Sequence, residues 1–301
     1  MIDIKNNILL KSLIIITIIA FIAIIWFTAT EEKYTKLIQL SNQTSRQMMG
    51  YILKTENGKL IVIDGGTIDD ADNLINQIYK NGGKVDHWFI THAHDDHAGA
   101  FTKVVNETKI EIDNVYISLN DYSWYAENEP DRAEFSKTLI DTVKQGRIKD
   151  VVIEPEINQI IEIDNLKAEI LGIKNPEIVE NAGNEQSMVI KFDTGERTLL
   201  VLGDTGVQSS EKLLRTQKDK LKSDVVQMAH HGQAGATKEL YEQVRPEICL
   251  WPCPEWLWNN DAGEGYNSGN WKTIETRQWM EELGVKQNYI EKDGTITIKL
   301  K

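Results

Sequence analysis

Apolar and polar residues alternate in short runs through most of the chain after residue 48. Over residues 50–66, GYILKTENGKLIVIDGG, two apolar β-rich runs flank the pair Asn57-Gly58, which predicts a hairpin. Over residues 69–81 the apolar positions instead recur at helical spacing, and Gly82 supplies a stop.

The same patterns continue to the end of the sequence. Apolar β-rich runs predict strands at 85–90, 114–119, 151–155, 160–173, 187–192, 198–204, 224–232, 247–251 and 294–300. Helical spacing predicts helices around 132–146, 208–218, 237–244 and 272–283. Hairpins alternating with single helices indicate an α/β protein whose sheets are covered by helices on their outer faces. No further domain boundary is visible, so residues 48–301 are expected to form one domain.

The first thirty residues have a different pattern. Residues 8–29 are almost entirely apolar and carry no charge after Lys11, and a helix of roughly 20 residues spans the hydrocarbon core. We therefore expect an N-terminal transmembrane helix within residues 1–30, followed by a linker over 31–47. Lys5 and Lys11 precede the span, which by the positive-inside rule places the catalytic domain outside the cell, anchored to the membrane. The alternative is a cleaved signal peptide, although WFTATEE has no clear small-x-small cleavage site.

The composition is that of a globular protein, with 41% hydrophobic and 26% charged residues. The formal net charge is −13; Asp3, Lys5 and Lys11 sum to +1 within residues 1–30, which leaves −14 for the rest. Strong general binding to nucleic acid needs a basic footprint and is therefore not expected, whereas small phosphate esters held by metal ions stay possible. The two cysteines, Cys249 and Cys253, are too few for a disulfide framework.

The stretch THAHDDHAG, residues 91–99, concentrates candidate metal ligands directly after a predicted strand. His92, His94, Asp96 and His97 offer four nitrogen and oxygen donors. One open catalytic ion takes about three protein ligands and a water, so two ions sharing a bridging water fit better. Asp95 is expected to be a neighbour and not a ligand.

Two later strands also end in ligand-type side chains. Asp204 closes the run TLLVLGD, and His230 and His231 close DVVQMAHHG. Five of the six histidines therefore fall in two places, and we expect these places to meet. The sixth, His87, lies inside a strand and is interpreted as a packed histidine.

On the motifs IDGG (63–66), THAHDDHAG (91–99), LGD (202–204) and AHHG (229–232), the chain resembles the metallo-β-lactamase superfamily. The resemblance implies an αββα sandwich with a dinuclear metal centre at one edge of its sheets. It implies that His92 and His94 hold the first ion, that Asp204 bridges both ions, and that Asp64 buttresses the histidine loop by hydrogen bonds. The second ion is expected to bind Asp96, His97 and His230.

Within that superfamily, these motifs are similar to those of the C-terminal domain of ComEC-type DNA-uptake channels and of their free-standing relatives. Many members supply a further histidine to the first ion, but no histidine lies between His97 and His230 here. Asn184, followed by Ser187, stands in the corresponding stretch and is a candidate weak ligand or substrate contact. The cofactors are expected to be two divalent ions, Zn²⁺ or Mn²⁺, and fewer nitrogens favour manganese.

Such a centre activates water for hydrolysis. We expect a phosphodiesterase acting on nucleic acid or a cell-envelope phosphodiester, including phosphorylcholine-type esters. Asp96 or Asp204 would orient the water, and His231 would contact a phosphate oxygen or protonate the leaving group, unless it only packs. The alternatives are an acyl, lactone or β-lactam hydrolase of the same fold, and a metal-binding scaffold without catalysis.

The Trp-rich stretch at 251–271 has two interpretations. It is either a lid that stacks on a base or sugar, or encloses a quaternary amine, or a loop held by its own aromatic side chains.

Overall fold

The computed structural model describes residues 11, 13–19 and 33–301, and the chain divides into two units, 1–34 and 35–301. In the first unit, Lys11 and residues 13–19 are helical. Among the described residues no helix is long and apolar enough to cross a membrane. The rest of the segment predicted to be an anchor, residues 1–10, 12 and 20–30, lies outside the described residues.

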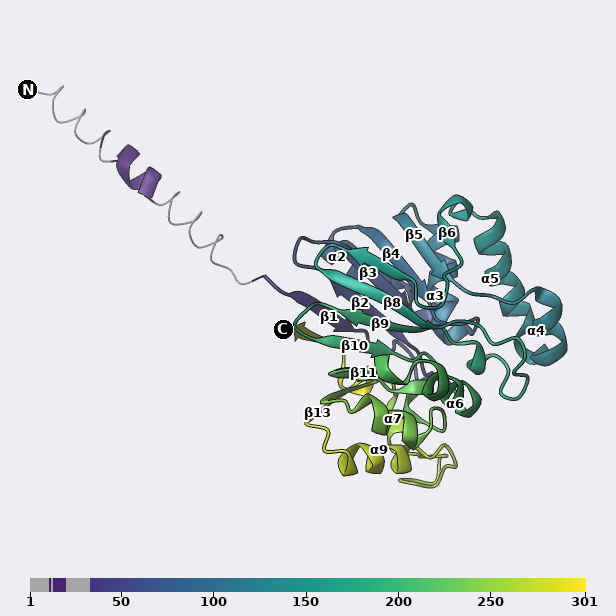
Figure 1. Cartoon of the computed structure of the whole chain (residues 1–301). Helices are drawn as coiled ribbons and strands as arrows, with labels where there is room; N and C mark the ends of the chain where they lie inside the picture. Colours follow the sequence, from purple (N-terminus) through teal and green to yellow (C-terminus); the bar gives the residue numbers. More distant parts are fainter. Residues whose placement is uncertain (1–10, 12, 20–32) are drawn as a thin grey trace, which may run out of the picture. The chain divides into compact units, whose positions relative to one another are not determined.

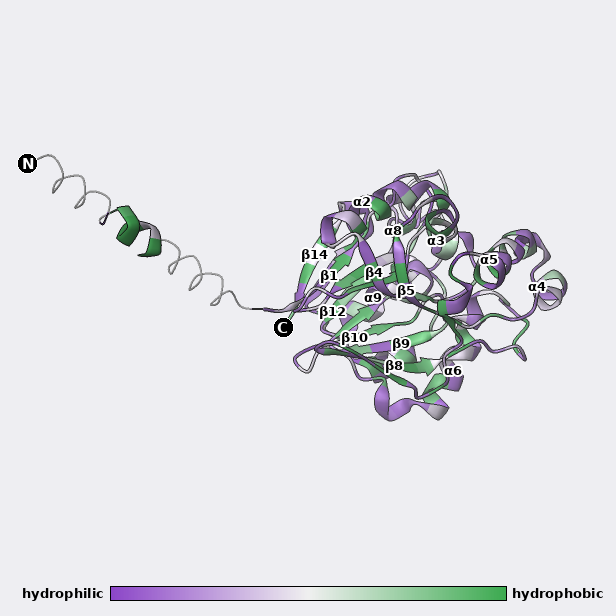
Figure 2. Cartoon of the chain, turned by 90° about the horizontal axis from the view of Figure 1, so that it is seen from above, coloured by the Kyte–Doolittle hydropathy of each residue, from purple (hydrophilic) through white to green (hydrophobic). Residues whose placement is uncertain are grey.

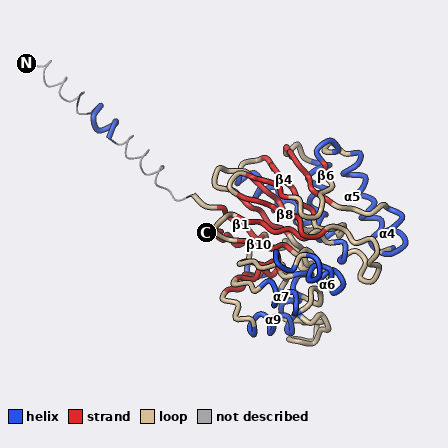
Figure 3. Tube along the Cα trace, in the orientation of Figure 1, coloured by secondary structure: helices blue, strands red, loops and turns tan. Residues whose placement is uncertain are grey.

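The second unit is built on two seven-stranded sheets (Figures 1 and 3). The first has the order β14 (Ile296–Leu300), β1 (Thr35–Gln39), β2 (Gly50–Lys54), β3 (Leu60–Asp64), β4 (Lys84–Ile90), β5 (Glu111–Ile117), β6 (Val152–Ile153). The second has the order β13 (Gln287–Ile290), β12 (Ile248–Trp251), β11 (Val225–Gln227), β10 (Thr198–Val201), β9 (Val189–Asp193), β8 (Leu166–Gly172), β7 (Ile160–Ile163).

Helices cover the outer face of each sheet. The first sheet is covered by α2 (Ala71–Asn81), α3 (Asp95–Glu107) and α5 (Ala133–Gln145), with α4 (Tyr122–Asn128) beside α5. The second is covered by α6 (Val207–Thr216), α7 (Lys238–Val244), α8 (Glu255–Trp258) and α9 (Thr273–Glu282). There are three hydrophobic clusters among the described residues, one between the sheets and one under each helical layer. The arrangement is the αββα sandwich that the resemblance implied.

The alternation of side chains along each strand explains these layers. In β4, Trp88 points to the helical layer and its neighbour Phe89 to the space between the sheets, where it stacks on Tyr116 at 4.6 Å. Phe89 also meets Phe192 of the opposite sheet edge-on at 5.5 Å. Figure 2 shows hydrophobic residues along many of the strands, as expected where side chains on both faces of a sheet are covered.

Two details differ from the sequence prediction. Residues 35–39, expected to belong to a linker, form β1 between β2 and β14, because Leu37 and Ile38 are buried on opposite faces of the sheet. The histidine cluster begins a helix that the sequence did not predict: His94 is the N-cap of α3, whose first residues are Asp95 and Asp96. Acidic residues are favourable in the first turn of a helix. Asp95 and Asp96 therefore also indicate a helix start, which the interpretation of this stretch as a set of metal ligands did not include.

Candidate metal centre

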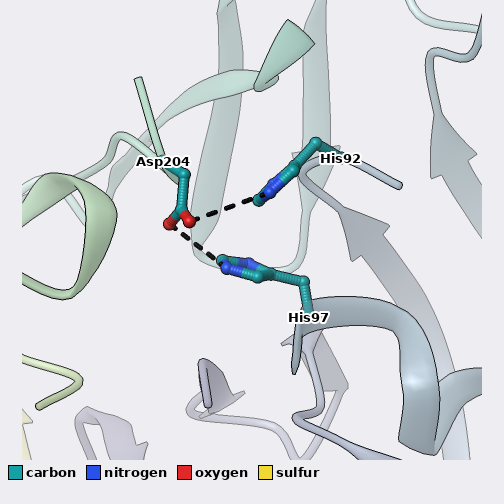
Figure 4. Close-up of side chains that lie close together, drawn as sticks. All are labelled: His92, His97 and Asp204. Atoms are coloured by element: carbon teal, nitrogen blue, oxygen red, sulfur yellow. Dashed lines mark ion pairs between the residues drawn. The ribbon is translucent and has the colours of Figure 1, made fainter. Parts of the chain in front are cut away.

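The predicted ligand residues meet where β4 and α3 join and where the loops after β10 and β11 begin. Figure 4 shows His92, His97 and Asp204 converging from these segments. The two carboxylate oxygens of Asp204 face different imidazoles: Oδ1 lies 3.2 Å from His97 Nε2, and Oδ2 lies 3.8 Å from His92 Nε2. Among the described residues, two groups are close enough to hold an ion, namely His92, His97 and Asp204, and Asp96, His97 and His231.

Asp64 makes the hydrogen bonds predicted for it. Its carboxylate, fully buried at the end of β3, accepts from Thr91 N, Thr91 Oγ1 and His97 Nδ1, each at 2.7 Å. Since His97 donates a hydrogen bond through Nδ1, its Nε2 faces Asp204 and is the ring nitrogen left to bind a metal ion. A carboxylate behind a ligating histidine fixes the tautomer and the ring orientation in this way.

The turn that carries Asp204 is held by its neighbours. Gln227 Oε1 accepts from Leu202 N and Gly203 N, both at 2.8 Å, and Ser187 Oγ accepts from Asp204 N at 2.9 Å. Gly203 has φ +57° and no room for a side chain, since an added Cβ would lie 2.9 Å from Ser187 Oγ. Both properties require glycine at this position.

His231, not His230, joins the centre. His231 Nε2 lies 3.3 Å from Asp96 Oδ2 and 3.6 Å from Asp204 Oδ2, while its Nδ1 donates to Pro252 O at 2.8 Å. His230 Nδ1 bonds Ala234 O, and its Nε2 lies 3.3 Å from Asn184 Nδ2. Both residues have positive φ, 51° and 56°, and this left-handed turn sends adjacent imidazoles in different directions. The structure therefore puts His231 at the place predicted for His230.

His94 and Asn184 lie at the edge of the centre. Neither belongs to the two candidate groups in the described part of the chain. The His94 ring meets that of His92 at 4.4 Å between centroids, but its Nε2 pairs with Glu129 Oε1 at 2.7 Å. Asn184 donates through Nδ2 to Asn181 Oδ1, and its own Oδ1 is buried without a hydrogen bond.

Several buried polar atoms make no hydrogen bond within the described part of the chain. They include His92 Nε2, His97 Nε2, Asp204 Oδ1 and His231 Nε2, which meet around the Asp204 carboxylate, and Asp96 Oδ1. Buried polar atoms in native proteins are almost always satisfied. Neutral imidazole and carboxylate donors at this spacing fit divalent ions, as the fold leads one to expect.

Charges within the centre perturb one another strongly in the metal-free protein. Burial lowers the pKa of His97, but the carboxylates of Asp204 and Asp64 outweigh it and hold the pKa well above its ordinary value. Burial raises the pKa of Asp204, but His97 and His231 outweigh it and hold that pKa well below its ordinary value. Burial and the neighbouring His97 and His94 hold the pKa of His92 well below its ordinary value, because Asp204 and Asp96 offset them only in part.

The remaining sequence assignments also find their places. Asp95 faces away from the centre and pairs with Arg46 Nη2 at 2.5 Å and Arg132 Nη1 at 3.0 Å. Arg132 Nη1 also lies 3.7 Å from Asp96 Oδ1, so a cation stands beside the centre. His87 of β4 stacks on Tyr116 of the neighbouring strand β5 and belongs to neither candidate group. Both cysteines are free thiols in the core.

Sequence reasoning missed Glu129 and Gln227, both of which act on the centre from other segments. Glu129 lies 35 positions from its partner His94, and no motif surrounds it. Gln227 precedes AHHG inside a predicted strand, where a buried polar side chain is the only signal.

The Trp-rich stretch is held largely by its own side chains. Trp251 and Trp258 meet edge-on at 5.3 Å, Trp256 and Trp271 at 4.9 Å, and Arg277 lies 3.9 Å above Trp258. The stretch nevertheless touches the histidine loop, since Ala234 N donates to Trp271 O at 2.7 Å. The interpretation of a loop pinned by its aromatics therefore fits the packing.

A cavity of about 630 Å³ is lined by residues from the loops that carry the candidate ligands. Its wall includes Glu185 and Gly206, which lie one and two positions from Asn184 and Asp204, and Gly235 from the loop after His231. Lys238, Lys272 and Trp279 line it further out. Its size suits a group as large as a nucleotide or a sugar phosphate.

The family model described as "Metallo-beta-lactamase superfamily" matches residues 49–249. The chain is 26% identical over 211 residues to "Recombination protein 2" of Haemophilus influenzae, covering 68% of this chain and 23% of that protein. It is 22% identical over 215 residues to "ComE operon protein 3" of Bacillus subtilis, covering 65% and 25%. The chain thus spans about a quarter of the length of these two relatives, which confirm the ComEC-like resemblance.

A shorter relative is matched over most of its length. It is "UPF0173 metal-dependent hydrolase THEYE_A0282" of Thermodesulfovibrio yellowstonii, 26% identical over 212 residues, with 68% of this chain and 70% of that protein covered. Among solved structures, the metallo-β-lactamase fold protein YhfI from Bacillus subtilis superposes with a TM-score of 0.53 at 11% identity, covering 89% of this chain and all of that one. At that identity the superposition shows the fold alone.

Proposed function

Because this chain belongs to the metallo-β-lactamase superfamily, we propose that it is a phosphodiesterase with a dinuclear metal centre. That it is a metal-dependent hydrolase follows from the family and from the relative of that name. The observation that carries the proposal is the two-sided carboxylate of Asp204. Its Oδ2 lies 3.8 Å from His92 Nε2 and its Oδ1 lies 3.2 Å from His97 Nε2, so one carboxylate could serve an ion at each histidine.

The ligand sets combine the two groups with what the resemblance implies. His92 would serve the first ion together with His94, which lies outside both groups. Asp96, His97 and His231 would serve the second ion, and Asp204 would serve both. When bound, such a pair of ions supplies Lewis acidity that lowers the pKa of water and offsets the charge on a phosphate. The protein's own part is to fix the donors: Asp64 orients His97, Pro252 O orients His231, and Ser187 and Gln227 hold the turn of Asp204.

Two features favour a phosphodiester over an acyl or lactam substrate. Arg132 stands beside Asp96, and a guanidinium matches phosphate oxygens. With His231 directed into the centre, His230 lies against Gly235 of the cavity wall and beside Asn184. It would make the contact to a phosphate oxygen or leaving group that the sequence assigned to His231. The relative named "Recombination protein 2" adds support for a nucleic-acid-related substrate.

The net charge of −13 points to a short substrate. A long duplex needs a basic surface, whereas a cavity beside two ions can take a small ester or the end of a strand. Nucleotides and envelope phosphodiesters, phosphorylcholine-type esters included, share this chemistry.

We further propose that the hydrolase domain is membrane-anchored and extracellular. The apolar run at residues 8–29 and the lysines before it support this orientation. Leu13 and Ile16, both in the described helical part, expose 64% and 63% of their surface. Protease added to intact cells should degrade the domain, and full protection would contradict the orientation.

The test of the function is hydrolysis of bis(p-nitrophenyl) phosphate by the metal-loaded chain. Asp204→Asn should lower the rate by at least about 100-fold, because it removes the shared carboxylate. The matched control is Asp86→Asn, whose carboxylate bonds Lys59 and Leu60 N at the start of β4, away from the centre. Lactone or β-lactam turnover without phosphodiesterase activity would overturn the proposal, and metal-loaded protein without any hydrolase activity would favour the scaffold.

A further inference from the structure

Glu129 directs its carboxylate at the metal centre from a segment that no motif marks. It lies between α4 and the 3-10 turn η2 (Pro130–Arg132), and its Oε1 is 2.7 Å from His94 Nε2. Its other oxygen, Oε2, is buried and makes no hydrogen bond among the described residues. A buried carboxylate oxygen without a donor is costly unless a cation completes it.

Gly183 packs directly against this pair. A Cβ added to Gly183 would lie 2.2 Å from His94 Nε2 and 2.3 Å from Glu129 Oε2. Gly183 has ordinary helical angles, φ −64° and ψ −42°, so the backbone conformation does not require glycine. Space is the remaining reason. The next residue, Asn184, also has a buried Oδ1 without a hydrogen bond.

We propose that Glu129 is a ligand of the first ion and completes the set that lacks a third histidine. Ligand atoms about 2.0–2.2 Å from one ion lie roughly 3–3.5 Å apart, so the 2.7 Å pair of His94 and Glu129 needs to open by under about 1 Å. The His92 ring, 4.4 Å from that of His94, supplies the neighbouring donor.

The proposal sets the metal preference of the first site. Two imidazoles and two carboxylates, Glu129 and Asp204, are a harder donor set than three imidazoles and one carboxylate. Oxygen ligands shift preference from zinc towards manganese. The inference rests on the dinuclear centre of the proposed function, but not on the identity of the substrate.

The test is metal binding by the full chain after removal of metal with a chelator, followed by titration with Mn²⁺ and with Zn²⁺. Calorimetry and the electron paramagnetic resonance signal of free Mn²⁺ give the number of ions and their affinities. Wild type should bind two Mn²⁺. In Glu129→Ala, the first site should bind Mn²⁺ at least about 100-fold more weakly. Glu127→Ala, which changes an exposed carboxylate on α4, is the matched control and should bind as wild type.

Glu129→Gln separates a ligand from a residue that only positions His94. The amide oxygen can still accept a hydrogen bond from His94, so a positioning role predicts two Mn²⁺ with unchanged affinity, and a ligand role predicts a weakened first site. Glu129→His should restore a second ion and shift the first site towards Zn²⁺. Two Mn²⁺ of wild-type affinity in folded Glu129→Ala or Glu129→Gln would overturn the inference. Two ions in wild type without phosphodiester hydrolysis would overturn only the proposed function.

Discussion

Asp64→Asn is expected to weaken metal binding more than it weakens folding. The carboxylate accepts three hydrogen bonds of 2.7 Å, one of them from His97 Nδ1, and it is fully buried. Asparagine keeps an acceptor for Thr91 N, but its amide group faces His97 with a donor. Loss of a carboxylate behind a ligating histidine costs about 10- to 100-fold in metal affinity, or about 1.4–2.7 kcal/mol.

Asp70→Asn is the matched control. Asp70 is also buried and accepts three hydrogen bonds, from Gln43 N at 2.7 Å, Thr67 N at 2.9 Å and Thr67 Oγ1 at 2.6 Å, none of them from a histidine. Thermal unfolding of the metal-free proteins measures the loss of stability, and competition with a chromophoric chelator measures metal affinity. Equal losses of affinity in the two variants would refute the reasoning, since the effect would then come from general loosening of the fold.

Three further predictions concern the centre and the core. Elemental analysis should find one bound ion in His231→Ala and two in His230→Ala. The reverse result would restore His230 as the ligand of the second ion, as expected from the sequence. Metal affinity should rise with pH until the pH passes the raised pKa of His97, because a metal ion must displace the proton that His97 then carries. A flat profile of affinity from pH 6 to 9 would contradict this. Burial also holds the pKa of Glu291 well above its ordinary value, although the backbone of Asn42 opposes this. Native protein then holds a proton that the unfolded chain releases near pH about 4.3, so stability falls as pH rises above that value. Glu291→Gln should raise the Tm at pH 8 and change it little at pH 4.

The fold was predictable wherever local pattern and burial agree. The hairpin around Asn57-Gly58 and the helix at 71–81 follow from turn chemistry and apolar spacing. β1 was missed because five residues beside a polar stretch carry little local signal, and its place depends on β14, which pairs with it from residues 296–300.

The site was predictable as a set of residues but not as an assignment. Motifs name Asp96, Asp204 and the histidines, but His230 and His231 are adjacent, and only the left-handed turn decides which one faces the ions. Glu129 is beyond sequence reasoning, because its contact with His94 depends on the packing of α5 against α3 and of α4 against α5.

The pairing of β1 with β14 has a consequence for protein engineering. Thr35 is the register partner of Leu300, so the two ends of the folded unit lie side by side in one sheet. A short linker can therefore join them, and new ends can be opened at the exposed turn around Gly58. That turn is at the opposite end of β3 from Asp64, so such a circular permutant should keep its metal centre while moving the points of attachment away from β1.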